Sequence, residues 1–218
     1  GSKLLMGHTA QASMPLQPIG LDAVMAKQAT VLDASPLIVL VVGETARAAN
    51  FGLGGYARDT TPRLRQLQAQ GELAYFSQVT SCGTNTQVSV PCLFSHFGRE
   101  AYGKNETPYE NLLDVLQRAG MSVLWLDNQS GCKGVCDRVS HFNTRELQDP
   151  QLCAEGECFD EIMLRVLPEK LAQTEAKAKT SYPDRRPSAG TVVVMHQMGN
   201  HGPAYYKRTP ADQKLYQP

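Results

Sequence analysis

The chain lacks the bulk features that would select a nucleic acid or a lipid surface as its partner. Its 218 residues carry 21 Lys and Arg against 21 Asp and Glu, so the formal net charge is zero. Without a net field to draw it to a polyanion, we expect no nucleic-acid contact. No window approaches the roughly 18 apolar residues of a membrane-spanning helix. The N-terminus has no signal-type start, and Gly1-Ser2 resembles an expression-vector remnant.

Internal repeats and low-complexity tracts are also absent, and the length suits one domain with a good core. Residues 1–36 contain three prolines and little hydrophobic periodicity, so they are expected to form a surface arm or a linker. Residues 37–218 are expected to form the domain itself.

Six cysteines fall into three couples that are close in the sequence: Cys82 with Cys92, Cys132 with Cys136, and Cys153 with Cys158. Six cysteines allow about fifteen connectivities, and local pairing is the best prediction. The alternative is one four-cysteine zinc site built from the second and third couples. Neither couple has the two-residue gap of such sites, and no His follows at finger spacing. Three disulfides indicate an oxidising compartment, which for a bacterial protein is the periplasm.

Apolar segments alternate with helical patterns along the chain. Strands are predicted over residues 37–42, 73–79, 121–126 and 191–196. The first is an unalternating β-branched run, which suits a strand covered on both faces. Helices are predicted over residues 61–70, 107–119 and 159–173, the second with a capping box that begins at Thr107. This alternation predicts an α/β domain with a mainly parallel sheet, in which His196 is a core histidine.

Polar side chains follow several predicted strands: Glu44, the Thr84/Thr86 loop, Asp127 and His201. In open α/β sheets, ligands bind beyond the carboxyl ends of the strands. Residues 81–92 are rich in hydroxyls and precede a helix start, which suits an exposed nucleophile or a phosphate cradle. Ser and Thr also favour helix caps for local reasons. Glu44 is equally compatible with a helix start and with a ligand.

A carboxylate, a hydroxyl and an imidazole without Ser-His-Asp spacing favour metal-assisted chemistry on a phosphate or sulfate ester. The hydroxyl of threonine is too weak an acid to ionise unaided at neutral pH, and a bound Zn²⁺ stabilises its alkoxide. On this interpretation Glu44 is an oxygen ligand, and Thr86 is both ligand and nucleophile.

Three motifs occur in order: Val42-Gly43-Glu44-Thr45-Ala46-Arg47, then Ser81-Cys82-Gly83-Thr84-Asn85-Thr86, then residues 195–206 with Asn200-His201-Gly202-Pro203. Together they resemble the periplasmic catalytic domain of lipid A phosphoethanolamine transferases, the colistin-resistance enzymes. The similarity runs over residues 37–218. It implies an alkaline-phosphatase/sulfatase-like fold, with a mainly parallel central sheet, helices on both faces, and zinc.

The resemblance also implies roles for single residues. Glu44 would be a zinc ligand and Thr86 the nucleophile, with Thr84 a lesser candidate. His201 would be among the phosphate or second-metal contacts. Asn111 would touch substrate, although an exposed polar residue on a helix is more often only solvated.

The implied reaction consists of two displacements at phosphorus. Thr86 attacks phosphatidylethanolamine, releases diacylglycerol and becomes phosphoethanolamine-threonine, after which a lipid A phosphate oxygen takes the group. The implied location is the periplasmic face of the inner membrane of a Gram-negative bacterium, through an N-terminal transmembrane domain that this sequence does not contain.

One family motif is missing. A later Asp-His-Gly sequence completes the zinc site of the family, and no Asp-His occurs in these 218 residues. Residues 37–218 are therefore expected to be a partial catalytic domain, either a fragment of a longer polypeptide or an inactive piece.

Two other functions stay open. A sulfatase, phosphodiesterase or phosphoglycerol transferase would keep the superfamily and change the reaction, although Val90-Pro91-Cys92-Leu93 lacks the arginine of the sulfatase nucleophile motif. A disulfide-stapled periplasmic module that binds phosphate would keep the fold without catalysis.

Overall fold

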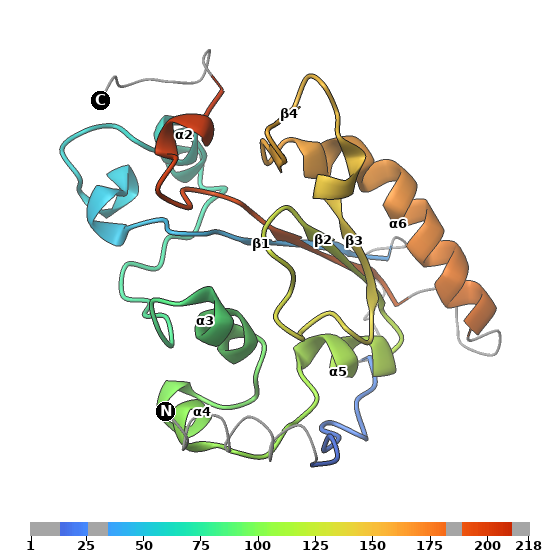
Figure 1. Ribbon diagram of the computed structural model, residues 1–218. Coiled ribbons are helices and arrows are strands. Elements are labelled where there is room, and N and C mark those ends of the chain that lie inside the picture. The colour runs from blue at the N-terminus through green and yellow to red at the C-terminus, as the bar shows by residue number, and fades with distance from the viewer. Residues whose placement is uncertain (1–13, 26–34, 182–188, 211–218) are drawn as a thin grey trace, which may run out of the picture.

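The computed structural model describes residues 14–25, 35–181 and 189–210 (Figure 1). Its strands are β1 (Leu37–Val42), β2 (Ser122–Asp127), β3 (Ser140–Asn143), β4 (Cys153–Ala154), β5 (Glu157–Cys158) and β6 (Thr191–His196). Its α-helices are α2 (Pro62–Ala69), α3 (Thr86–Leu93), α4 (Arg99–Lys104), α5 (Leu112–Arg118) and α6 (Ile162–Ser181). Short 3-10 helices are η1 (Ala48–Asn50), η2 (Gly52–Gly54), η3 (Thr144–Leu147) and η4 (Tyr205–Lys207). No helix in these described ranges is long and apolar enough to cross a membrane.

Four parallel strands form the central sheet, in the order β1-β6-β2-β3. Side chains of β2 and β6 alternate between its two faces, as the period of two in a strand requires. One set packs against Val90 of α3, Phe94 just after it and Leu113 of α5. The other set packs against Ile162, Met163 and other apolar residues of α6. Helices therefore cover both faces of the sheet, with α6 on one side and α3 and α5 on the other (Figure 1).

The cysteines pair as their proximity in the sequence predicts. Disulfides join Cys82 to Cys92, Cys132 to Cys136, and Cys153 to Cys158. The last of these staples the β4–β5 hairpin, whose strands pair antiparallel.

Two strand predictions are wrong in whole or in part. Residues 73–79 form no strand, and Phe76 and Val79 are 76% and 77% exposed. An apolar run becomes a strand only where a partner strand lies beside it, and none does so within the described residues. The strand at 37–42 exists but is not covered on both faces, because its side chains are exposed or only half-buried, and within this part of the chain it pairs only with β6.

The helix predicted over 107–119 begins later, at Leu112. Its capping box joins Asn111 and Asp114, not Thr107 and Glu110. The N-terminal segment explains the shift: Gln17 donates to Pro108 O and accepts from Glu110 N, which holds this stretch extended. The helices predicted over 61–70 and 159–173 are close to α2 and α6, although α6 continues to Ser181 through Pro168. Helix α4 and strand β3 were not predicted.

The burial of Leu113 in α5 allows a test of this packing. Leu113 is fully buried between α5 and the sheet, whereas its neighbour Leu112 is 42% exposed. We expect Leu113→Ala to lower the free energy of unfolding by about 2–5 kcal/mol, because it leaves a cavity in the core. Leu112→Ala should cost no more than about 1 kcal/mol. Urea unfolding of both variants measures this, and equal losses would contradict the assigned packing.

Candidate active site

The register of the sheet brings three chain segments to one edge. Val42, His196 and Asp127 are paired neighbours at the ends of β1, β6 and β2. Because the strands are parallel, the residues that follow each of them leave the sheet at the same side. Residues 43–45, 197–201 and 128–133 therefore gather beyond the carboxyl ends of the strands.

Glu44 and Thr86 meet at this edge. The Thr86 hydroxyl donates a hydrogen bond of 2.8 Å to Glu44 Oε2. The other carboxylate oxygen, Oε1, accepts from the Thr45 hydroxyl at 2.7 Å. Thus the structure brings together the two residues that the sequence singles out as nucleophile and metal ligand, although 42 positions separate them.

Thr86 is placed by the start of α3. Asn85 is the N-cap, and its side chain accepts from Gln87 N at 2.8 Å. Thr86 is thus the first helical residue, and its own backbone N–H finds no acceptor within the described residues. A helix N-terminus presents such unpaired donors and a positive dipole end to an anion. The Cys82–Cys92 disulfide ties the preceding loop to the far end of the same helix.

Glu44 is placed from its other side by the loop after β6. Gln197 N donates to Val42 O, and Asn200 N donates to Glu44 O at 2.9 Å. Between them, Gly199 has φ +53° and touches the Glu44 main chain: a Cβ at Gly199 would lie 2.6 Å from Glu44 O. Only glycine allows so close an approach in this conformation.

His201 lies in the same loop but is exposed, and its imidazole makes no hydrogen bond within the described residues. Its backbone is fixed, because its N–H donates to Met198 O and its carbonyl accepts from Arg208 Nε at 2.7 Å. A contact of His201 with phosphate or a second metal stays a prediction.

Asn111 is the N-cap of α5. Its Oδ1 accepts from Leu113 N at 2.8 Å, and its Nδ2 donates to Val135 O at 2.9 Å. Both polar atoms of the amide are already used within the fold, so substrate contact by Asn111 also stays a prediction. The lesser candidate Thr84 is exposed and has no hydrogen bond to Glu44.

A cluster of buried polar side chains lies at the carboxyl ends of β2 and β6, next to the site. Asp127 Oδ2 accepts from His196 Nδ1 at 3.1 Å and from Trp125 Nε1 at 3.0 Å. Its Oδ1 accepts from Gln129 N and Gly131 N, which fixes the loop after β2. The prediction of a core histidine is confirmed, since His196 is completely buried. The sequence places Asp127 at the end of a strand, but it gives no signal for the four donors that hydrogen-bond to its carboxylate.

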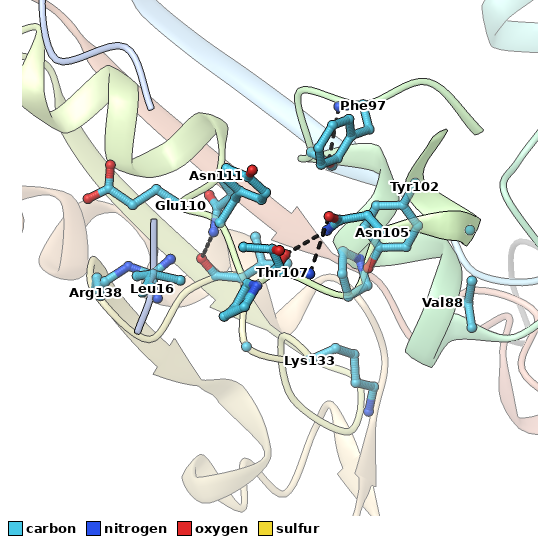
Figure 2. Close-up of a pocket in the computed structure, with 17 residues that line it drawn as sticks. Leu16, Val88, Phe97, Tyr102, Asn105, Thr107, Glu110, Asn111, Lys133 and Arg138 are labelled. Atoms are coloured by element: carbon cyan, nitrogen blue, oxygen red, sulfur yellow. Dashed lines mark hydrogen bonds between the residues drawn. The ribbon is translucent and has the colours of Figure 1, made fainter. Parts of the chain in front are cut away.

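A cavity of about 450 Å³ opens beside α3 (Figure 2). Val88 and Pro91 of α3 form one wall, and Phe97 and Tyr102 line it from the segment that follows. Burial raises the pKa of the Tyr102 phenol. Lys133 also lines the cavity, and its ammonium donates to Ser130 O at 2.8 Å. The lining is therefore mixed, because the charged side chains of Glu110, Lys133 and Arg138 lie beside the apolar ones.

The donor set at the edge suits part of a zinc site. Two carboxylate oxygens of Glu44 and the Thr86 hydroxyl converge, and carboxylate oxygen is an ordinary zinc ligand. In the part of the chain that is described, the one cluster of three metal-type side chains is Cys132, Cys136 and Asp137. Its cysteines form a disulfide, which removes both thiolates. Glu44 and Thr86 can therefore supply two ligands of such a site.

The chain is similar to known proteins over these same residues. A sequence model of the family described as Sulfatase matches residues 36–218. The chain is 44% identical over 212 residues to phosphoethanolamine transferase EptA of Salmonella typhimurium, a match that covers 97% of this chain and 36% of that protein. It is 41% identical over 179 residues to phosphatidylethanolamine transferase Mcr-2 of Escherichia coli, over 79% of this chain and 30% of that protein.

A solved structure gives the same result. The integral membrane protein lipooligosaccharide phosphoethanolamine transferase A of Neisseria meningitidis matches with a TM-score of 0.84 and 38% identity, over 100% of this chain and 38% of that one. The chain spans about a third of the length of these relatives. The resemblance predicted from the motifs is confirmed, and so is the alkaline-phosphatase/sulfatase-like fold class.

The Asp127 cluster predicts a pH dependence of stability. Burial raises the pKa of the Asp127 carboxyl, but the hydrogen bonds from His196, Trp125 and Gly131 more than offset this and hold the pKa below its usual value. A carboxyl with a lowered folded pKa stabilises the fold above its unfolded pKa of about 3.9, and this contribution is lost as the pH falls through the folded pKa.

We therefore expect Asp127→Asn to lose part of the fall in unfolding free energy that the wild type shows when the pH drops below about 4. Urea unfolding at a series of pH values measures the slope. Asp137→Asn, at an exposed neighbour on the same loop, should keep the wild-type slope. Identical slopes for all three proteins would show that Asp127 has no such role.

Proposed function

The chain belongs to the sulfatase family, and from this premise we propose that it is the catalytic part of a zinc-dependent phosphoethanolamine transferase. The proposed donor is phosphatidylethanolamine and the proposed acceptor a lipid A phosphate, a modification that confers resistance to polymyxins such as colistin. Its similarity to phosphoethanolamine transferases supports the transferred group. The observation that carries the proposal is the 2.8 Å hydrogen bond between Thr86 Oγ1 and Glu44 Oε2.

The geometry supports an attack by Thr86 on phosphorus. Glu44 Oε2 accepts the hydroxyl hydrogen and so fixes the direction of the Thr86 oxygen. Zinc, when bound, would supply the positive charge that lets this oxygen act as an alkoxide at neutral pH. The free N–H of Thr86 and the dipole of α3 face a phosphoryl oxygen that approaches the helix start.

The first displacement forms a bond from Thr86 Oγ1 to phosphorus and breaks the bond to the diacylglycerol oxygen, which takes up a proton and leaves. Thr86 then carries phosphoethanolamine. In the second displacement a lipid A phosphate oxygen attacks the same phosphorus, the bond to Oγ1 breaks, and Thr86 regains its proton. Splitting one transfer into two steps lets a single site serve two lipids in turn.

The proposed setting is the periplasmic face of the inner membrane. Three disulfides are consistent with an oxidising compartment. We propose that residues 37–218 are one part of the catalytic domain, that residues 1–36 are an arm that leads to it, and that attachment to the membrane comes from a segment outside this sequence.

A covalent adduct tests the nucleophile. Incubation of the zinc-loaded full-length protein with phosphatidylethanolamine should add one phosphoethanolamine group to the protein, read by intact mass. Thr86→Ala should abolish the adduct, because it deletes the attacking oxygen. Thr84→Ala is the matched control, since it removes a hydroxyl from the same loop, and it should keep the adduct. An adduct that persists in Thr86→Ala and vanishes in Thr84→Ala would move the nucleophile to Thr84.

The donor headgroup tests the reaction class. We expect release of diacylglycerol from fluorescent phosphatidylethanolamine to exceed release from phosphatidylglycerol by at least about tenfold, a difference of roughly 1.4 kcal/mol in transition-state binding. Removal of zinc with a chelator should abolish both signals. A preference for phosphatidylglycerol would indicate a phosphoglycerol transferase, and no release from either lipid would favour a binding module.

A further inference from the structure

Asp160 connects the disulfide hairpin to the loop that touches Glu44. It lies between β5 and α6, and its two carboxylate oxygens face the start of the loop after β6. Oδ1 accepts from Met198 N at 2.7 Å, and Oδ2 accepts from Gly199 N at 2.9 Å. Two successive backbone N–H groups that converge in this way form an anion-binding concavity, and here the anion is a side chain of the protein itself.

A hydrogen bond from Asn128, at the end of β2, fixes the position of Asp160. Asn128, completely buried at the end of β2, donates from Nδ2 to Asp160 Oδ1 at 2.9 Å and to Cys158 O at 2.9 Å. The Oδ1 of Asn128 accepts from the Thr144 hydroxyl at 3.0 Å. The carboxylate is therefore held against the sheet by a buried network, and it cannot follow the loop if the loop moves.

The loop that Asp160 binds also contacts the Glu44 main chain. Gly199, whose N–H Asp160 binds, is the residue whose Cβ would lie 2.6 Å from Glu44 O and 2.9 Å from Glu44 N. The next residue, Asn200, donates to Glu44 O. A shift of the Met198–Gly199 turn would therefore lengthen the hydrogen bond from Asn200 N or move the Glu44 main chain with it.

We propose that Asp160 is a positioning residue for the Glu44–Thr86 pair: by binding the N–H groups of Met198 and Gly199, it sets the place of the Glu44 carboxylate and hence the zinc affinity of the site. The catalytic consequence rests on the function proposed above. The geometric consequence does not, because it concerns the protein without substrate. Asp160 touches no reacting atom in this scheme.

The main test compares Asp160→Asn with Glu161→Gln. The second variant removes an equivalent charge from an exposed side chain one position further along. An amide in place of the Asp160 carboxylate keeps one acceptor and turns a donor toward the second N–H. We expect Asp160→Asn to bind zinc about 10–100-fold more weakly, the range found when a residue that orients a metal ligand is changed. Glu161→Gln should bind zinc like the wild type.

Zinc affinity is measured in the full-length protein by competition with a fluorescent chelator, and hydrogen exchange of the amides in residues 197–201 is followed in the metal-free protein. The expected result is faster exchange together with weaker zinc binding in Asp160→Asn. Faster exchange with wild-type zinc affinity would overturn the inference, because Asp160 would then hold only the loop. Hydrogen exchange is independent of the proposed function, and zinc affinity is independent of transfer, so a failure of transfer alone would leave both readouts intact.

Gly199→Ala keeps the inference testable if Asp160→Asn folds poorly. It leaves the carboxylate in place and puts a methyl group against Glu44 O, so it should also weaken zinc binding. Since both changes act through the same contact, the double variant should lose less than the product of the two single losses. Fully multiplicative losses would show two separate routes and contradict the proposal.

In the transferase assay, kcat should fall with zinc occupancy while KM for the donor stays within about twofold, as expected for a change that does not touch substrate.

Discussion

The candidate site depends on one hydrogen bond, from the Thr86 hydroxyl to the Glu44 carboxylate, which joins the start of α3 to the loop after β1. Neither group could be held by its own segment alone, because each lies at the end of an element where the backbone turns. α3 is fixed by its Asn85 cap, by the Cys82–Cys92 disulfide and by Val90 in the core. Glu44 is fixed by the loop after β6. The sheet holds the loops after β1 and β6 next to each other, since these two strands are hydrogen-bonded in register.

Below this pair the fold keeps polar groups where a purely structural domain would place apolar ones. Asp127, Asn128 and His196 are buried at the ends of neighbouring strands, and a buried polar group costs free energy unless it is hydrogen-bonded. Asp127 satisfies this rule with four donors, and Asn128 with three partners. His196 Nε2 finds no partner within the described residues. This network gives the strand ends fixed directions, which apolar packing cannot do because it has no preferred orientation.

The hairpin closed by Cys153–Cys158 serves the same purpose at the other side of the site. Besides Asp160, it carries Glu157, which pairs with Arg208 at 2.9 Å, and Arg208 in turn donates to the carbonyl of His201. Hydrogen bonds from the hairpin region therefore reach both ends of the loop that carries His201. A disulfide restricts the hairpin in the unfolded chain and keeps a very small element defined. The position of His201 relative to Glu44 is thus set in part by Glu157, Asp160 and Arg208, which lie outside the three motifs.

The sequence by itself determined the α/β class, three of the four central strands, the main helices, the three cysteine pairs, and the choice of Glu44 and Thr86, because each is written in local pattern or in a contiguous motif. Only the tertiary structure decided that residues 73–79 form no strand, that β1 lies at the edge of the sheet within the described residues, and that α5 starts at Leu112. The same holds for Asp160, which meets Met198 and Gly199 across 38 and 39 positions. The physical reason is that strand pairing, burial and long-range hydrogen bonds depend on neighbours that folding supplies, and periodicity along the chain carries no record of which neighbour that will be.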